Sequence, residues 1–267
     1  MLYIVATPIG NLEDITMRAL RVLGEVDVIA AEDTRRTIKL LNHYEIKTKL
    51  LSFHEHSDKG KRDRIIGELL DGKDIALVSD AGTPLISDPG AILVSEAVSR
   101  GIEVTSMPGA CAAITALTLS GQDGAFAFVG FLPKKASDKA KAIEKIAERD
   151  MVSVLYESPH ALSKTLDALR IACGEDRHIV VAKELTKIHE HVFRGSLKEA
   201  IDFFGIENKG EYVLIVSERE EETEATDEQI IALLDEYITN GMTKKDAANA
   251  TSKKLGIRPN RAYRLTL

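Results

Sequence analysis

The sequence predicts an α/β protein built from two α/β domains and a small helical tail. Its 267 residues have the length of two compact domains with an appendage. Hydrophobic residues make up 44% and charged residues 29%, an ordinary globular balance that excludes disorder over most of the chain. Short apolar runs alternate with helical patterns, which is typical of sheets joined by crossover helices.

The first domain is expected over residues 1–119. Its apolar runs have the length and β-branched content of buried strands, and they lie at 2–7, 26–32, 49–53, 74–80 and 103–107. Helices are expected between them at Thr16–Leu23, Thr34–His43, Asp58–Leu70 and Pro89–Arg100. Strict alternation of strand and helix predicts a parallel sheet.

The second domain is expected over residues 120–222, after the cluster of helix breakers at Ser120–Gly124. Strands are predicted at 125–131, 151–158, 178–185, 190–196 and 211–218. The interleaved helices are predicted at Ser137–Arg149, Pro159–Ala172 and Leu197–Phe204. This pattern indicates a second α/β domain.

The tail, residues 223–267, is predicted to be helical. Thr226 and Gln229 form a capping-box pattern, and Gly241 ends the helix that follows. An alanine-rich helix, a turn at Gly256 and a helix opened by Pro259 resemble a helix-turn-helix. A helical cap or dimer arm explains this pattern as well as nucleic-acid binding does.

Charge is unevenly distributed on this acidic chain, whose formal net charge is −7. The segment from Arg35 to Arg64 contains nine basic and four acidic residues, and the segment from Met242 to Leu267 contains seven basic residues and one acidic residue. Two basic zones make a nucleic-acid partner plausible. The cysteines, Cys111 and Cys173, fit a reducing compartment, and no apolar run is long enough to cross a bilayer. The chain starts with a strand pattern instead of a signal peptide, so a cytoplasmic protein is expected.

Polar segments follow the predicted strands of the first domain, where open parallel sheets bind ligands. Asp80 ends a strand with no helix start close behind it, so a ligand contact explains it better than a cap. Asp88 before Pro89 instead has the pattern of a helix cap. No GxGxxG, Walker or GxSxG motif is present, which argues against an ordinary dinucleotide fold, a P-loop and covalent catalysis.

Two histidine pairs raise the possibility of a metal site. His54 and His56 alternate along the chain, and so do His189 and His191. The cysteines are isolated and no third ligand is spaced to match, so no metal is expected. For His54 and His56, contact with a polar substrate is the preferred interpretation.

At these segments the chain becomes recognisable. ATPIGNLEDIT, AEDTRRT, VSDAGTPLISDPG, PGACAA, GFLP, YESPH and KELTKIHEHVFRGSL occur in this order. The chain thereby resembles the ribosomal RNA small subunit methyltransferase I family, which is one of the tetrapyrrole-methylase-like methyltransferases, over essentially its whole length. The resemblance implies two α/β domains of the tetrapyrrole methylase type with S-adenosyl-L-methionine in the cleft between them. It also implies 2′-O-ribose methylation of a cytidine in the decoding centre of 16S rRNA, in the small ribosomal subunit, by a homodimer.

The resemblance also implies which residues contact the cofactor. They are carried over by position as Pro8, Ile9, Gly10, Asp80, Ala81, Gly82, Thr83, Gly109, Ala110, Cys111, Ala112, Tyr156, Glu157, Ala182 and Glu211. A ribose hydroxyl is a very weak acid, so a general base would assist its attack. The carboxylates on the expected edge are Glu32, Asp33 and Glu157, with His54 as a weaker candidate, and the sequence does not choose among them. Arg35 and Arg36, together with His54 and His56, are the predicted RNA contacts.

Two rival functions remain at this stage. A small-molecule methyltransferase with a tetrapyrrole-like substrate would have the same fold, although an aromatic content of 5% and the basic zones favour RNA. A helix-turn-helix protein whose α/β body only senses a ligand would bind duplex nucleic acid through its isolated tail.

Overall fold

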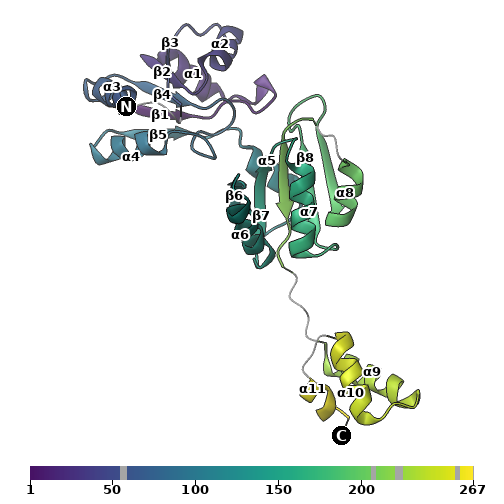
Figure 1. Cartoon of the computed structure of the whole chain (residues 1–267). Coiled ribbons are helices and arrows are strands. Elements are labelled where there is room, and N and C mark those ends of the chain that lie inside the picture. Colours follow the sequence, from purple (N-terminus) through teal and green to yellow (C-terminus); the bar gives the residue numbers. More distant parts are fainter. Residues whose placement is uncertain (55–58, 206–208, 220–224, 256–258, 267) are drawn as a thin grey trace. The chain divides into compact units, whose positions relative to one another are not determined.

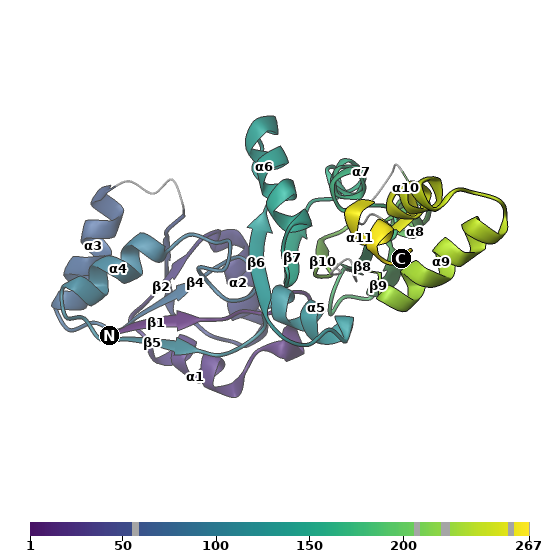
Figure 2. The same cartoon turned by 90° about the horizontal axis from the view of Figure 1, so that it is seen from below.

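The computed structural model describes residues 1–54, 59–205, 209–219, 225–255 and 259–266. The chain divides into two compact units, Met1–Arg219 and Glu220–Leu267 (Figure 1). The first unit contains two five-stranded sheets with their helices, and the second contains the helices of the tail (Figure 2). The predicted α/β class and the helical tail are therefore confirmed.

The first sheet is entirely parallel and has the strand order β3-β2-β4-β1-β5. Its strands are β1 (Leu2–Val5), β2 (Val28–Ala31), β3 (Lys49–Ser52), β4 (Ile75–Val78) and β5 (Val104–Met107). β1 lies in register between its neighbours, since Leu2 is paired with both Ile75 and Val104. Because every pair is parallel, the carboxyl ends of all five strands lie along one edge.

Helices cover both faces of the first sheet. They are η1 (Leu12–Asp14), α1 (Met17–Glu25), α2 (Thr34–His43), α3 (Lys59–Leu70) and α4 (Ala91–Ser99). Side chains alternate along β2: Ile29 and Ala31 pack with α1 and α2, whereas Val28 and Ala30 pack with α3 and α4. Burial on both faces explains why these strands are continuous apolar runs.

Local capping agrees with the predicted starts of α1 and α2 but not with that of α4. The side chains of Thr16 and Asp33 accept backbone N–H groups at the starts of α1 and α2. α4 has Gly90 at its N-cap, with φ 128° and no side-chain cap. The interpretation of Asp88 as the cap of this helix is therefore wrong, and its carboxylate has another environment.

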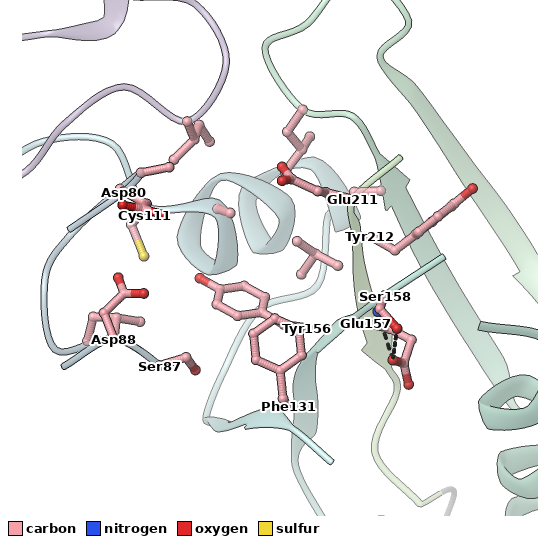
Figure 3. Close-up of a pocket in the computed structure, with 18 of the residues that line it drawn as sticks. Asp80, Ser87, Asp88, Cys111, Phe131, Tyr156, Glu157, Ser158, Glu211 and Tyr212 are labelled. Carbon is pink, nitrogen blue, oxygen red and sulfur yellow. Dashed lines mark hydrogen bonds between the residues drawn. The ribbon is translucent and has the colours of Figure 1, made fainter. Parts of the chain in front are cut away.

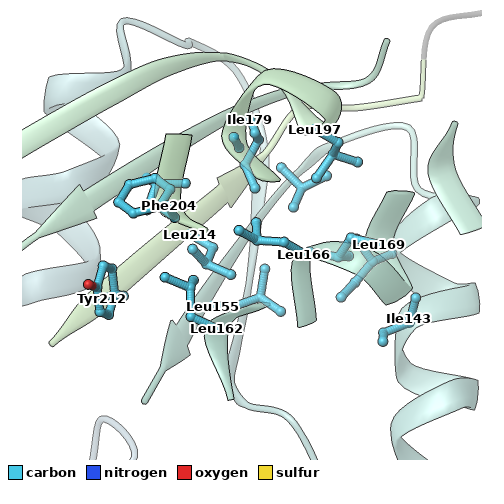
Figure 4. Packing of buried hydrophobic residues seen from close by; sticks show 14 residues of the cluster. Ile143, Leu155, Leu162, Leu166, Leu169, Ile179, Leu197, Phe204, Tyr212 and Leu214 are labelled. Carbon is cyan, nitrogen blue, oxygen red and sulfur yellow. The ribbon is translucent and has the colours of Figure 1, made fainter. Parts of the chain in front are cut away.

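The second sheet is mixed and has the strand order β6-β7-β10-β8-β9. Its strands are β6 (Phe126–Phe131), β7 (Val152–Glu157), β8 (His178–Lys183), β9 (His191–Ser196) and β10 (Tyr212–Val216). Only β6 and β7 are parallel to each other, and the remaining pairs are antiparallel. One face is covered by α6 (Ala136–Ala147), α7 (Leu162–Cys173) and α8 (Leu197–Phe204), whose apolar side chains form the core in Figure 4.

The opposite face of the second sheet carries α5 (Ala112–Ser120). Its buried residues Ala113 and Ala116 pack against Val154, Val180 and Ile215. The predicted boundary between residues 119 and 120 stays a prediction, but α5 packs on the second sheet although all of it except Ser120 precedes that boundary. The segment before α5 is thus the connection between the sheets.

The tail contains α9 (Asp227–Thr239), α10 (Lys244–Leu255) and α11 (Pro259–Arg264). The predicted capping box of Thr226 and Gln229 is confirmed in both directions. Ile230 and Leu234 pack against Ala247 and Ala248 in a core of small residues. The predicted turn at Gly256 lies outside the described residues. Within the described ranges, no helix combines the length and apolarity needed to span a membrane.

Candidate functional site at the edge of the first sheet

The loops after β1 and β4 are joined by their backbones. Thr7 and Gly82 exchange two hydrogen bonds of 2.9 Å as an isolated antiparallel bridge. Gly82 has φ +81°, and a Cβ there would lie 3.2 Å from Ile9 Cγ2. This close approach in a left-handed conformation explains the glycine in the SDAGTP segment. Thr83 extends the connection to the β5 loop, because its hydroxyl donates to the carbonyl of Ala110 at 3.0 Å.

Asp80 connects the ends of β2 and β4. Its Oδ1 accepts the backbone N–H of Asp33 at 2.9 Å, and its Oδ2 lies 3.5 Å from Arg36 Nε. The backbone N–H of Asp80 donates to Glu32 Oε2 at 3.3 Å. The role of Asp80 thus includes organisation of this edge as well as lining a cavity.

The segment from Thr83 to Gly90 has an unusual backbone. Leu85 and Ser87 have φ values of 74° and 68°, which residues other than glycine rarely adopt. Such conformations persist only where the surroundings impose them, and they are concentrated at functional sites. Ser87 reaches the second sheet, since a Cβ on Gly130 would lie 2.8 Å from its Oγ.

A cavity of about 330 Å³, the first cavity, opens at this edge (Figure 3). The loops after the strands of the first sheet contribute Ile9, Asp80, Ala81, Gly82, Thr83, Ile86, Ser87, Asp88 and Cys111, and the first turns of α2 and α5 contribute Arg36 and Ala112. The second sheet and its loops contribute Phe131, Tyr156, Glu157, Ser158, Pro159, Ala182, Leu185, Glu211, Tyr212 and Val213. Its volume lies in the range of small-molecule sites.

Tyr156 projects into the first cavity toward Cys111 and Asp88 (Figure 3). Its hydroxyl accepts the backbone N–H of Ala113 in the first turn of α5 at 3.2 Å. Phe128 and Phe131 pack edge-on against its ring, with centroids 5.2 and 5.5 Å away. Burial raises the pKa of this phenol, so Tyr156 stays protonated and provides an amphipathic wall.

The loop after β8 closes against the loop after β1. A Cβ on Gly10 would lie 2.6 Å from Lys187 Cγ and 2.9 Å from the carbonyl oxygen of Leu185. Lys187 Nζ bridges Glu184 and Glu211 at 2.8 and 2.9 Å. Gly10 therefore permits close packing between the loops, whereas Glu211 reaches the cavity wall.

A second cavity of about 360 Å³ lies on the α3 and α4 side of the same edge. It is lined by Glu32, Phe53, His54, Arg62, Ser87, Asp88, Pro89, Gly90, Ala91, Ile92 and Leu93. Ser87 and Asp88 line both cavities. Desolvation raises the pKa of Asp88 to about 6, with the charges of Glu32 and Asp80 acting in the same direction and a hydrogen bond with Ser79 opposing them.

The structure brings most predicted cofactor residues together. Those that line the first cavity are Ile9, Asp80, Ala81, Gly82, Thr83, Cys111, Ala112, Tyr156, Glu157, Ala182 and Glu211, whereas Pro8, Gly10, Gly109 and Ala110 do not. A Cβ on Gly109 would lie 2.8 Å from Ala6 Cβ, so this glycine serves close packing. The predicted cofactor residues lack Ile86, Phe131 and Tyr212, although Ile86 lies in VSDAGTPLISDPG, Phe131 lies in GFLP and Tyr212 follows Glu211.

The three proposed bases have different surroundings. Asp33 is held by the Arg35 side chain at 2.7 Å, and this contact lowers the pKa of Asp33 to about 2, which makes it a poor proton acceptor. Glu157 accepts the Ser158 N–H at 2.7 Å and the Thr165 hydroxyl at 2.5 Å, and Figure 3 shows its side chain on the opposite side of β7 from Tyr156. Glu32 lines the second cavity.

The predicted RNA contacts are separated by the structure. Arg35 has an 88% exposed side chain, and Arg36 lines the first cavity beside Asp80. His54 lines the second cavity, and His56 lies outside the described residues. Within the part of the chain that the structure describes, no group of three His, Cys, Asp or Glu side chains is arranged to hold a metal ion.

Comparison with known proteins gives a consistent result. The family model for tetrapyrrole (corrin/porphyrin) methylases matches residues 1–201. The chain is 44% identical to ribosomal RNA small subunit methyltransferase I of Halalkalibacterium halodurans, over 99% of this chain and 93% of that protein. It is 44% identical to the protein of the same name from Haemophilus influenzae, over 100% of this chain and 96% of that protein. A solved diphthine synthase shares the fold with a TM-score of 0.60 and 15% identity, over 81% of this chain and 89% of that one.

Proposed function

Because the chain belongs to the ribosomal RNA small subunit methyltransferase I family, we propose that it methylates the ribose 2′-hydroxyl of a cytidine in the decoding centre of 16S rRNA. The methyl donor in this proposal is S-adenosyl-L-methionine. The observation that carries the proposal is the first cavity, which the SDAGTPLISDPG segment and the second sheet line together.

The lining of the first cavity suits this donor. Ile9, Ala182 and Val213 provide apolar surface, while Thr83 and Tyr156 place a few polar atoms among them. Several carboxylates line the cavity against the single guanidinium of Arg36, a balance that favours a cationic ligand. When bound, S-adenosyl-L-methionine supplies an activated methyl group on a sulfonium centre.

The residues of the chain would contribute orientation and exclusion of water. Gly82 is held by backbone bonds to Thr7, and Thr83 by the bond from its hydroxyl to the Ala110 carbonyl, so they form a pre-organised wall. The rings of Phe131 and Tyr156 shield the opposite side. Positioning reactants in a fixed geometry can supply several kcal/mol of a reaction barrier, about 7–11 kcal/mol in the best cases.

Arg35 and Arg36 at the start of α2 are the proposed contacts with RNA phosphate. Both follow the edge that lines the first cavity, and the exposed Arg35 side chain is accessible to a large substrate. The small ribosomal subunit as substrate and a homodimer as the active form belong to the same proposal.

The test is methyl transfer to small ribosomal subunits that lack the modification. The purified chain is incubated with S-adenosyl-L-methionine labelled in the methyl group, and the labelled position is mapped by nuclease digestion. Label on the 2′-oxygen of one decoding-centre cytidine is the expected result. Label on free tetrapyrrole substrates alone would establish the small-molecule rival. Duplex binding by the tail without any transfer would establish the ligand sensor.

A further inference from the structure

The two cavities at the edge of the first sheet meet at the strained segment before α4. Ser87 and Asp88 line both of them, whereas the remaining lining residues belong to one or the other. Direct transfer of a group requires the reacting atoms of donor and acceptor to be in contact, so the donor and acceptor subsites must adjoin. The proposed donor residues Asp80, Thr83 and Ala182 all line the first cavity, so the acceptor belongs in the second.

We propose that the second cavity holds the target nucleotide and that Asp88 accepts the proton of its ribose hydroxyl. This inference rests on the proposed function and deepens it. It assigns the acceptor subsite and a catalytic residue for the same reaction.

The lining of the second cavity suits an unstacked nucleotide. Phe53, Ile92 and Leu93 provide apolar surface, and His54 and Arg62 bring polar ring and guanidinium groups to the same cavity. Arg62 is held in place by an ion pair with Glu96 of α4 at 2.8 Å. Proteins recognise single-stranded RNA bases by stacking on aromatic rings or guanidinium planes and by hydrogen bonds to their edges.

Asp88 differs from two other carboxylates that line the first cavity, Asp80 and Glu211. Asp80 is bonded to Asp33 and Arg36, and Glu211 is paired with Lys187. Within the described residues, Asp88 is half-buried and takes part in no ion pair. The charged and titratable groups lining the two cavities around it are Glu32, Arg36, His54, Arg62, Asp80, Cys111, Tyr156, Glu157, Glu211 and Tyr212.

This environment makes Asp88 an effective proton acceptor near neutral pH. Its raised pKa of about 6 keeps the carboxylate ionised at pH 7 yet more basic than an exposed aspartate. Asp33, with its lowered pKa, lacks this basicity, and Glu157 is occupied by Ser158 and Thr165.

The proposed methyl transfer needs only the donor, the ribose hydroxyl and the Asp88 carboxylate. The ribose oxygen forms a bond to the methyl carbon, and the carbon–sulfur bond of the donor breaks with its electron pair staying on sulfur. The hydroxyl proton passes to the carboxylate of Asp88, which later releases it to water. No oxidant, reductant or metal is required.

The first experiment compares the wild-type chain with Asp88→Asn on undermethylated small subunits. We expect kcat to fall ~100-fold or more, the range of a general base, while the Kd values of S-adenosyl-L-homocysteine and RNA stay within ~3-fold. The wild-type kcat/KM should rise with pH to a plateau above about 6, because Asp88 must be ionised. The variant should lose this rise, and Asp88→Glu should restore part of kcat.

Asp71→Asn is the matched control, because Asp71 is an exposed aspartate that lines neither cavity. It should keep wild-type kcat. Wild-type transfer together with an Asp88→Asn rate within ~3-fold of wild type would overturn this inference and leave the proposed function standing. Absence of transfer by the wild type would instead overturn the proposed function.

The acceptor subsite has its own test in Ala91→Leu. Ala91 is the exposed first residue of α4 and lines only the second cavity, so a larger side chain there occupies the acceptor space. We expect KM for the subunit to rise ~10-fold while the Kd of S-adenosyl-L-homocysteine is unchanged. Ala136→Leu, at the exposed first residue of α6, is the control and should leave both constants unchanged. An unchanged KM for Ala91→Leu would contradict the proposal that the target nucleotide binds in the second cavity.

Discussion

The two sheets contribute to the first cavity in different ways. The parallel sheet contributes loops beyond its strands, with Ile9, Asp80 and Cys111 as examples. The mixed sheet contributes residues from the strands themselves, such as Tyr156 and Val213 on the face that carries α5. One side of the cavity is therefore made of backbone turns, and the other combines strand side chains with loop residues such as Leu185 and Glu211.

This difference has consequences for tolerance to substitution. The loops are held by backbone bonds such as the Thr7–Gly82 bridge, so a change in backbone conformation moves several lining residues at once. A strand side chain can be altered while the ladder of backbone bonds stays intact. We therefore expect loop substitutions to have the larger effects on donor binding.

Gly82→Val should have the largest effect. A β-branched residue is strained at φ +81°, and its Cβ would crowd Ile9. We expect the Kd of S-adenosyl-L-homocysteine, measured by calorimetry, to rise ~100-fold, corresponding to ~2.7 kcal/mol. Gly72→Val is the matched control, since Gly72 has φ +88° with open space around it. This variant should lose stability but keep the wild-type Kd of S-adenosyl-L-homocysteine. Equal binding by both variants would contradict the role of the loop.

Replacing Arg35 and Arg36 with alanine should separate RNA binding from donor binding. RNA affinity should fall ~10-fold at moderate salt, and the slope of log K against log salt should decrease by ~1–2. Donor affinity should stay within ~3-fold, because Asp80 keeps its bond to the Asp33 N–H. Arg21→Ala, which breaks an exposed pair with Glu25, is the control. An unchanged salt slope in the double variant would place RNA elsewhere.

Tyr156→Phe tests the second sheet with a smaller change. The variant keeps the ring but loses the acceptor for the Ala113 N–H. We expect this change to weaken binding of S-adenosyl-L-homocysteine by ~1 kcal/mol, which raises its Kd ~5-fold. Tyr44→Phe removes a comparable bond to the Leu12 carbonyl and should leave this Kd unchanged. An effect of Tyr156→Phe as large as that of Gly82→Val would contradict the contrast between the sheets.

The smallest expected effect is on stability. The folded-state pKa of Asp88 is raised from 3.8 to about 6, so keeping it ionised costs stability above pH 6 and costs none below its unfolded value. Asp88→Asn should therefore raise Tm by ~2–4 °C at pH 7.5. The gain should shrink as pH falls through 6 and vanish near pH 4. A Tm difference that does not vary with pH would show that Asp88 is not desolvated as described.

The α/β class, the parallel first sheet, the helical tail and the loops that line one side of the first cavity could be predicted from the amino-acid sequence alone. Local sequence patterns are sufficient to predict these features, because the strands are continuous apolar runs and each of these loops comes directly after a strand in the sequence. The exact domain boundaries and the roles of the site residues stay predictions.

The position of Asp88 and the other side of the cavity depend on tertiary packing. The Asp88-Pro89 pattern predicts a cap, but the chain stays outside the helix until Gly90, so the carboxylate lies between two cavities. Phe131 and Tyr212 reach the site because the order of the strands, which no local pattern encodes, brings them beside it. The physical reason is that desolvation and proximity depend on residues distant in sequence, and these contacts exist only once the sheets are packed.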